Sequence, residues 1–364
     1  MSVRILGPQQ GDVLNRHDGV ETAEALTVEV QVAAPQGAQV AVNGQPARAK
    51  GGAFVCTASL TAQRNTITAT ATVGGATTQD AITVLWDKGS RPRYRLSVDD
   101  NIQFLRDLGT EADRYPSLFD HWYLTFWRRM HEEYGAKIHL NIYYQTVTQD
   151  FTLAQLPDRW RGEWEANAPW LHLSFHALQD KPDRIYRNAT YDQIARDYDL
   201  VVNEIKRFAG ESVLTNETTV HWAEAPKEAC RALHDRGIRT LIGIFRREFD
   251  GECTTGYYLP ADLKDHIETR DAWYDAETDL LFVVEDATVN SLAVAEVDPW
   301  LNRQAQSPHT SELMELLIHE QYFRQELEYF QPDVQEKVTR SLDWVTTRGY
   351  EPVFWGEGLL GGRG

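Results

Sequence analysis

Two histidines and two neighbouring carboxylates give this chain the residue types of a mononuclear hydrolytic metal site. His172 and His176 are four residues apart, and Asp99 and Asp100 follow an apolar stretch further upstream. Two neutral imidazoles and one carboxylate can hold a divalent ion with positions left open, and a spare carboxylate can act as a base on bound water. Residues i and i+4 share a face on a strand and are neighbours on a helix, so either element would let both histidines chelate one ion.

The elements that must position these residues alternate between strands and helices after residue 92. Strands are expected at 93–98, 137–144, 170–175, 218–222, 239–245, 280–284 and 352–355, and helices at 102–108, 116–134, 191–208, 226–236, 311–319 and 332–348. This alternation predicts a parallel barrel, in which chemistry gathers at the C-terminal ends of the strands. Six candidate residues stand at or just past such ends: Asp99, Asp100, His172, His176, His221 and Trp355.

The first 88 residues predict a separate all-β domain. Short alternating runs are separated by turn signals such as Asn43-Gly44, which favours a tight hairpin. Strands at this spacing predict a β-sandwich over 1–88, a polar linker over 89–95 and a barrel domain over 96–364. The runs 40–47 and 64–67 resemble bacterial immunoglobulin-like modules attached to carbohydrate-active enzymes.

Composition excludes several classes of partner. The net charge of −18 opposes nucleic acid or an anionic membrane as the main partner. No apolar run is long enough to span a membrane, and no secretory leader is visible, so a cytoplasmic protein is expected unless a leader was removed from a secreted or periplasmic one. Cys56, Cys230 and Cys253 form no Cys-x-x-Cys pair, which argues against a thiolate metal site. The sequence indicates no oligomeric state.

Residues 95–360 resemble the polysaccharide deacetylase family, the carbohydrate esterases with a NodB-type homology domain. The run 97–101 occupies the place of the family's Thr-Phe-Asp-Asp-Gly motif, 172–176 that of its His-Ser/Thr-x-x-His motif, and 316–319 that of its Leu-x-x-His motif. The resemblance implies a deformed (β/α) barrel with one divalent ion, zinc by preference. It also implies Asp100, His172 and His176 as ligands, Asp99 as the base and His319 as the acid.

The chain departs from the family pattern at three places. Asn101 replaces a glycine, Leu173 replaces a serine or threonine, and 220–224 stands where an Arg-Pro-Pro-Tyr stretch is expected. That arginine normally orients the base, so His221 or a neighbour would do this work or bind substrate. Further candidates for substrate contact are Trp222, Glu320 and Trp355. Core packing is the first expectation for the two tryptophans, and His319 could instead be a core histidine in a helix.

These observations favour a metal-dependent hydrolase that removes an acyl group, as amide or ester, from a carbohydrate. A non-catalytic glycan-binding protein on a degenerate barrel is the first alternative, although a retained base and acid argue against it. A glycoside hydrolase with paired carboxylates is the second alternative. It ranks last because the side chains of the sequence neighbours Asp99 and Asp100 should diverge.

Overall fold

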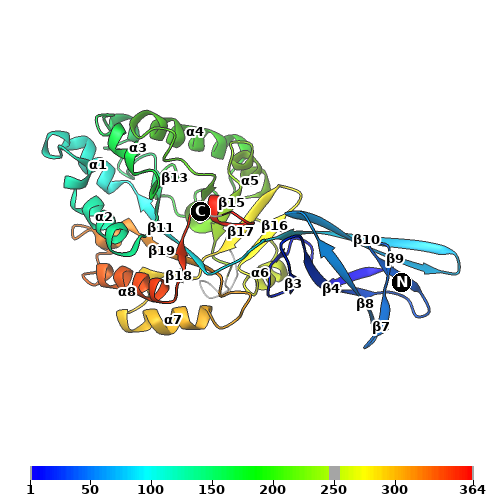
Figure 1. Cartoon of the computed structure of the whole chain (residues 1–364). Helices are drawn as coiled ribbons and strands as arrows, with labels where there is room; N and C mark the ends of the chain where they lie inside the picture. The colour runs from blue at the N-terminus through cyan, green and yellow to red at the C-terminus, as the bar shows by residue number, and fades with distance from the viewer. Residues whose placement is uncertain (1, 246–254, 363–364) are drawn as a thin grey trace. The chain divides into compact units, whose positions relative to one another are not determined.

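The computed structural model describes residues 2–245 and 255–362 (Figure 1). The chain divides into two compact units. The first comprises Met1–Arg91 with Ala272–Asp279 and Gly358–Arg363, and the second comprises Pro92–Asp271 with Leu280–Glu357. Within the described residues, no helix is both long and apolar enough to cross a membrane.

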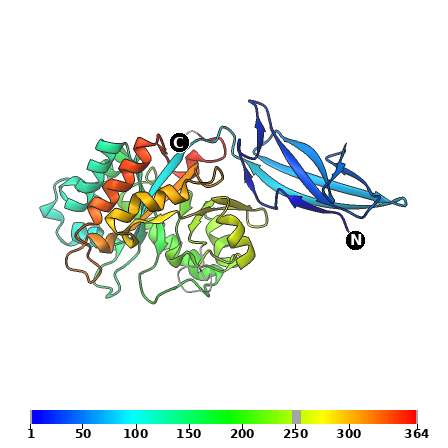
Figure 2. The ribbon, with the colours of Figure 1, turned by 90° about the horizontal axis from the view of Figure 1, so that it is seen from below.

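The first unit consists mainly of strands, drawn in blue in Figure 2. Its strands are β1 (Arg4–Gly7), β2 (Val13–Leu14), β3 (Gly19–Glu21), β4 (Leu26–Ala33), β5 (Gln39–Val42), β6 (Gln45–Pro46), β7 (Arg48–Lys50), β8 (Ala53–Leu60), β9 (Arg64–Val73), β10 (Ala76–Trp86) and β16 (Ala272–Asp275). One five-stranded sheet has the order β1-β4-β8-β7 with β3 on β4, and the other has the order β2-β10-β9-β5-β6. In β4, buried Leu26, Val28, Val30 and Val32 alternate with more exposed residues, which builds the core of this unit.

The predicted immunoglobulin-like sandwich is wrong as a fold assignment. The sheet that contains β2 is mixed, because β2 pairs with β10 in parallel, whereas the pairs of the other sheet are antiparallel. Residues from two distant parts of the chain, 272–279 and 358–363, also belong to this unit. Alternation and turn signals specified where strands form, but they contain no information about which strands become partners.

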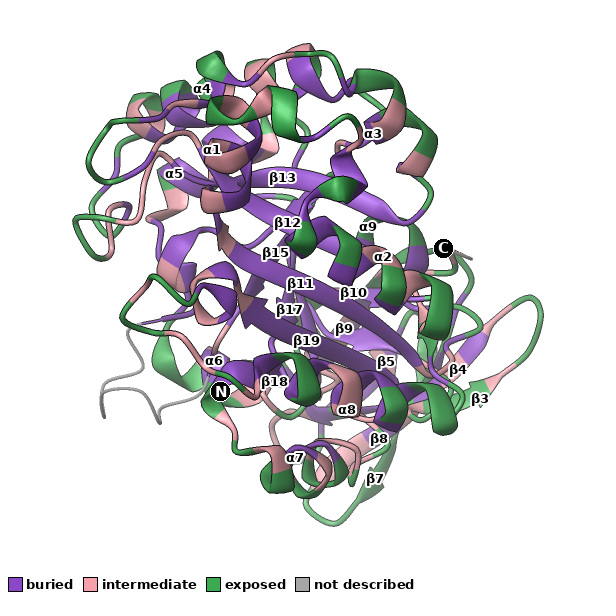
Figure 3. Ribbon diagram, turned by 90° about the vertical axis from the view of Figure 1, so that its left-hand side faces the viewer, coloured by how far each residue is buried: buried purple, intermediate pink, exposed green. Residues whose placement is uncertain are grey.

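The second unit is built on a six-stranded sheet with the order β13-β12-β11-β19-β18, and β20 also pairs with β11. The strands are β11 (Arg93–Asn101), β12 (Ile138–Tyr143), β13 (Leu171–Ala177), β18 (Ala287–Thr288), β19 (Leu313–His319) and β20 (Glu351–Pro352). All these pairs are parallel. Figure 3 shows the long central strands buried, with helices that expose one face.

A separate parallel sheet contains β14 (Glu217–Thr218), β15 (Thr240–Gly243) and β17 (Leu280–Val284) in that order. The predicted closed barrel is therefore wrong: the described strands form two sheets, and only an isolated bridge between Leu173 and Leu214 leads from β13 toward β14. Strand and helix alternation predicts parallel pairing, but closure depends on short strands such as β14 that carry little sequence signal.

Helices pack around these sheets. They are α1 (Gln103–Thr110), α2 (Trp122–Tyr134), α3 (Arg161–Asn167), α4 (Tyr191–Phe208), α5 (Lys227–His234), α6 (Ala261–Ile267), α7 (Val297–Gln304), α8 (Val334–Thr347) and α9 (Trp355–Gly358). The helix expected at 311–319 is wrong, because this run forms β19. Its residues are buried almost throughout, and a short apolar run of this kind does not distinguish a buried strand from a helix. Cys230 is buried on α5, whereas Cys253 lies outside the described residues.

Polar residues occupy one face of three adjacent central strands. Ser97 pairs in register with His139 and His139 with His172, while Asn141 pairs with Ser174 one layer further on. Because side chains alternate along a strand, these polar residues and Asp99 lie on one face and leucine, isoleucine and valine residues on the other. The polar face leads directly to the carboxyl ends of β11, β12 and β13.

Candidate metal centre

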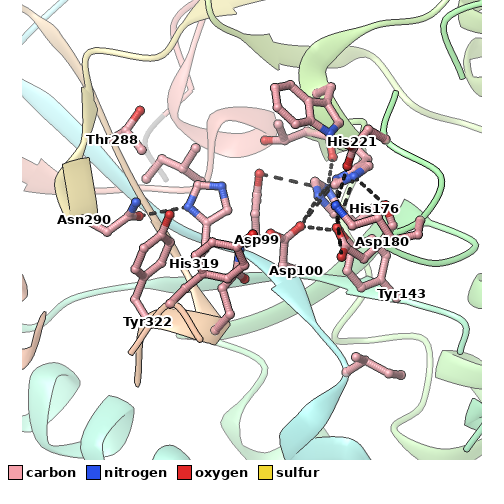
Figure 4. Close-up of a pocket in the computed structure, with 18 of the residues that line it drawn as sticks. Asp99, Asp100, Tyr143, His176, Asp180, His221, Thr288, Asn290, His319 and Tyr322 are labelled. Atoms are coloured by element: carbon pink, nitrogen blue, oxygen red, sulfur yellow. Dashed lines mark hydrogen bonds and ion pairs between the residues drawn. The ribbon is translucent and has the colours of Figure 1, made fainter. Parts of the chain in front are cut away.

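A cavity of about 550 Å³ lies in the second unit, where β11, β12, β13 and β19 end. The polar residues that line it include Asp99, Asp100, Tyr143, His176, His221 and His319 (Figure 4). The expectation that site residues gather at carboxyl ends of strands holds for this group. The cavity is large enough to enclose a sugar-sized ligand.

Asp100, His176 and His221 form the group in the described chain that could hold a metal ion, with one ligand atom from each residue within 4.8 Å of the others. Nε2 of His176 lies 3.1 Å from Oδ1 of Asp100, and Nδ1 of His221 lies 3.2 Å from Nε2 of His176. Nδ1 of His221 lies 3.4 Å from Oδ1 of Asp100. A tetrahedral ion with ligands at about 2.0–2.1 Å places its ligand atoms about 3.3 Å apart, so the donor set fits zinc.

The outer nitrogens of both histidines face backbone carbonyl groups. Nδ1 of His176 lies 2.6 Å from the carbonyl of Thr219, and Nε2 of His221 lies 3.2 Å from that of Asp180. Each of these nitrogens must therefore carry the hydrogen and donate it outward, which leaves the inner nitrogens as acceptors. Three acceptors then face one another beside the hydroxyl of Tyr143, and either a bound cation or a proton on one imidazole would balance them.

Electrostatics in this group favour an ionised carboxylate beside the histidines. Burial alone would raise the pKa of Asp100, but its hydrogen bonds to His176 and His221 hold that pKa well below the usual value. Burial alone would lower the pKa of His176, but Asp99 and Asp100 outweigh it and raise that pKa. The hydroxyl of Tyr143 also donates to Oδ1 of Asp100. The cluster therefore attracts positive charge, as a cation site requires.

A local distortion of β11 brings both aspartates to the cavity. Asp100 has a φ of +63°, and the register between β11 and β12 shifts between Val98 and Asn101. This left-handed residue interrupts the normal alternation, so Asp99 and Asp100 line the same cavity rather than pointing apart. The expected divergence of these two side chains is therefore wrong.

One carboxylate oxygen of Asp99 is hydrogen-bonded, and the other lies near His176 of the metal-binding group. Its Oδ1 accepts a hydrogen bond of 2.6 Å from Nδ2 of Asn141, and its Oδ2 lies 4.0 Å from Nδ1 of His176. The group that orients Asp99 is thus Asn141, whereas His221, the expected candidate for this task, lies in the metal-binding group. The sequence alone did not identify Asn141 as a candidate site residue.

The structure does not bring His172 to the cluster, which corrects the expected ligand set. On β13 the rise of about 3.3 Å per residue separates His172 from His176 by about 13 Å, although they share a face. The His172 ring stacks on Phe354 with centroids 3.7 Å apart and planes inclined by 13°. Burial lowers the pKa of His172 to about 3. It is a neutral core residue, and His221 is instead the third residue of the group that could hold an ion.

His319, the expected acid, and Trp222, an expected substrate residue, both line the cavity. Nδ1 of His319 lies 2.9 Å from Oδ1 of Asn290, and Figure 4 shows His319 and His221 on opposite sides of the two aspartates. Trp222 has a φ of +64°, a strained conformation for a bulky residue, which persists at functional sites when neighbours enforce it. The guanidinium of Arg184 lies 4.8 Å from its ring centroid.

Two expected substrate residues instead stabilise the fold. Glu320 is fully buried and accepts hydrogen bonds from the backbone N–H groups of Ile102, Gln103 and Phe104, so it caps the start of α1. Trp355 is buried and donates from Nε1 to Glu315 at 2.7 Å. Neither residue lines the cavity.

Sequence reasoning missed four polar residues at or beside the cavity: Asn141, Tyr143, Asp180 and Asn290. A signal for two of them exists in 138–143, where His139, Asn141 and Tyr143 alternate with Ile138, Leu140 and Ile142. Interior strands of parallel sheets usually have continuous apolar runs, so alternation in such a strand indicates a polar interior face.

No protein-family description and no curated protein matches the chain. Among solved structures, a Bacteroides fragilis protein provisionally described as an alpha-galactosidase is 10% identical, with 94% of this chain and 78% of that chain covered and a TM-score of 0.29. A Parabacteroides merdae beta-glucuronidase is 11% identical with a TM-score of 0.27, and the match covers 87% of this chain but only 47% of that chain, about half its length. Likenesses this weak carry no argument about fold or function.

Proposed function

We propose that the protein is a metal-dependent hydrolase of the polysaccharide deacetylase type, which removes an acyl group from a carbohydrate. The observation that carries this proposal is the convergence of one carboxylate and two imidazoles at tetrahedral ligand spacing on the wall of a cavity. A set of two histidines and one carboxylate suits zinc and leaves a position open for water or substrate. When bound, such an ion lowers the pKa of water toward about 7 and polarises a carbonyl oxygen.

In this proposal Asp99 acts as the general base. It is buried at the cavity wall, beside ligand residue Asp100, with Asn141 holding one of its oxygens. The other oxygen is left to accept a proton from the attacking water. A non-catalytic glycan-binding protein would not need a second carboxylate held in this way.

In this proposal His319 acts as the general acid. Its side chain enters the cavity from β19, and the side-chain carbonyl oxygen of Asn290 accepts the hydrogen of Nδ1. Nδ1 is therefore fixed, and Nε2 is the nitrogen that can give a proton to the leaving amine or alcohol. His319 and His221 lie on opposite sides of the two aspartates, which supports separate roles for the two histidines (Figure 4).

Aromatic side chains at the cavity support a carbohydrate as the substrate. Trp222, Tyr322 and Tyr329 line it, and 56% of the surface of Tyr329 is exposed. Aromatic faces with a polar edge combine apolar contact area with a hydrogen-bonding group, as recognition of a sugar ring requires.

Acetate release from N-acetylated chito-oligosaccharides tests this proposal. The purified protein would be assayed as isolated, after chelation and after reloading with zinc. We expect chelation to abolish acetate release, zinc to restore it, and Asp99→Asn to lower kcat at least about 100-fold. Asp113→Asn removes an exposed carboxylate and serves as the matched control.

Three results would each contradict the proposal in a different way. Full activity in chelator would exclude the metal, and cleavage of the glycosidic bond would indicate a glycoside hydrolase. Tight oligosaccharide binding without release of any acyl group, tested on ester-linked and amide-linked acetyl substrates, would indicate a glycan-binding protein.

A further inference from the structure

A row of hydrogen-bonded side chains, called the file below, leads from Asp99 into the interior of the second unit, and Thr218 joins it at Ser174 and Asn141. Asn141 donates from Nδ2 to Oδ1 of Asp99 at 2.6 Å, and Ser174 donates to Oδ1 of Asn141 at 2.5 Å. Nε2 of His139 lies 2.8 Å from the hydroxyl of Ser174, and Nε of Arg95 donates to Nδ1 of His139 at 3.1 Å. All five residues are buried, and they come from the adjacent strands β11, β12 and β13.

Arg95 and Glu217 both face Nδ1 of His139: two guanidinium nitrogens, which can only donate, and Oε1 of Glu217 at 3.2 Å. Because Glu217 already accepts from Arg95, the two guanidinium donors favour Nδ1 as an acceptor and Nε2 as the nitrogen that carries the hydrogen. His139 then donates to Ser174, which directs its own hydroxyl hydrogen to Oδ1 of Asn141. The Asn141 amide is thereby fixed with its NH₂ group toward Asp99. Burial and the charge of Arg95 lower the pKa of His139 well below its usual value, which keeps the ring neutral.

Arg95 is itself firmly held. Its guanidinium lies 2.7 Å from Glu217 and 2.6 Å from Glu315, and all three side chains are fully buried. The cation at the base of the file therefore has little freedom to move. Aligned hydrogen bonds in a buried environment polarise one another, so the last N–H group, on Asn141, is a stronger donor than an isolated amide.

We propose that Asn141 is a positioning residue for the base Asp99, and that Ser174, His139 and Arg95 fix the orientation of its amide; this rests on the proposed function. The file does not conduct protons, because an amide cannot pass one from its oxygen to its nitrogen. Its role is to hold Oδ1 of Asp99 so that Oδ2 faces the reacting water. Loss of this hydrogen bond lowers kcat more than it alters substrate binding.

Exchange of the two side chains tests the contact without any substrate. Asn141→Asp keeps the shape but removes the donor and places two carboxylates together, so we expect a lower Tm at pH 8. The double variant Asn141→Asp with Asp99→Asn rebuilds the pair in reverse, with the introduced amide at position 99 as donor, and should recover most of the lost Tm. Melting would be followed with zinc bound and after chelation. Additive losses in the double variant would overturn the proposed contact.

Kinetics test the positioning role. We expect Asn141→Asp to lower kcat about 100-fold on N-acetylated chito-oligosaccharides, with KM within about twofold and zinc affinity unchanged. Ser174→Ala frees the amide to rotate and should give a smaller loss, which Ser174→Thr should partly restore. The exchanged double variant should remain inactive, because the carboxylate at position 99 is gone.

The outcomes separate this inference from the proposed function. A kcat for Asn141→Asp equal to that of the unaltered protein would overturn the positioning role. Absence of acyl hydrolysis by the unaltered protein, with Tm recovered in the exchanged variant, would overturn the proposed function and leave the hydrogen-bonded file intact.

Discussion

Replacement of His172 by phenylalanine should make the protein less sensitive to acid. His172 is stacked on Phe354 and buried, and burial lowers its pKa from 6.5 to about 3. The folded protein therefore keeps this ring neutral, whereas the unfolded chain binds a proton below pH 6.5. The contribution of His172 to the free energy of unfolding is fully present above pH 6.5. It falls as the pH is lowered toward 3, because the unfolded state binds more protons over this range.

The magnitude follows from the shift in pKa. Each pH unit below 6.5 costs about 1.4 kcal/mol, so lowering the pH from 6.5 to 5.0 costs about 2 kcal/mol through His172 alone. Phenylalanine has no proton to bind, and its ring can keep the stacking on Phe354.

Urea unfolding of both proteins at pH 7.0, 6.0 and 5.0 measures this effect. We expect the variant to lose about 2 kcal/mol less than the unaltered protein between pH 7.0 and 5.0, while its zinc affinity stays unchanged. Parallel stability curves for the two proteins would refute the assignment of His172 as a neutral core residue. Loss of zinc binding in the variant would instead restore it as a ligand.

Three further predictions concern the interior and the cavity. Burial raises the pKa of Glu315 to about 8, so the folded protein keeps this proton at pH values where the unfolded chain loses it. Stability should therefore fall as the pH rises from 4.5 to 8, by up to about 1.4 kcal/mol per pH unit, and urea unfolding should show a shallower fall for Glu315→Gln. Trp222→Ala should raise KM for chito-oligosaccharides about tenfold with little change in kcat, because it removes a stacking face; equal losses in kcat would contradict this role. Six carboxylates and one lysine line the cavity, so its formal charge is −5, or −3 with a divalent ion bound. Oligosaccharides with free amines should therefore inhibit more strongly than uronic acid oligomers, and added salt should weaken this difference.

The sequence was sufficient to locate most strands and helices but not to determine how the strands pair. Apolar runs and turn residues are local signals, and they place β11, β12, β13 and β15 close to the ranges expected. The partner of each strand depends on contacts between distant parts of the chain. Neither the parallel pairing of β2 with β10 nor the division into two sheets is visible in local sequence.

The candidate site was predicted in part for similar reasons. Asp99, Asp100, His176 and His319 reach the cavity because each stands at the carboxyl end of a strand. The pair His172 and His176 was misassigned because sharing a face of a strand was equated with proximity. The rise along a strand keeps such residues too far apart for one ion.

The third ligand residue depends on chain geometry that sequence does not encode locally. His221 belongs to a short 3₁₀ turn, His221–Ala223, in which Trp222 and Ala223 have positive φ. A strand was expected at this place, and no turn residue marked the change of direction. Asn141 was missed because a single asparagine within a strand has no spacing signature, although the alternation around it indicates a polar face.

Zinc titration of three proteins tests the central claim most directly. Calorimetry on the metal-free unaltered protein should show one equivalent bound, and His172→Phe should bind with the same affinity. His221→Ala should bind at least about 100-fold more weakly, because it removes one of the three converging ligand atoms. Undiminished zinc binding by His221→Ala, or loss of binding in His172→Phe, would contradict the metal centre described above.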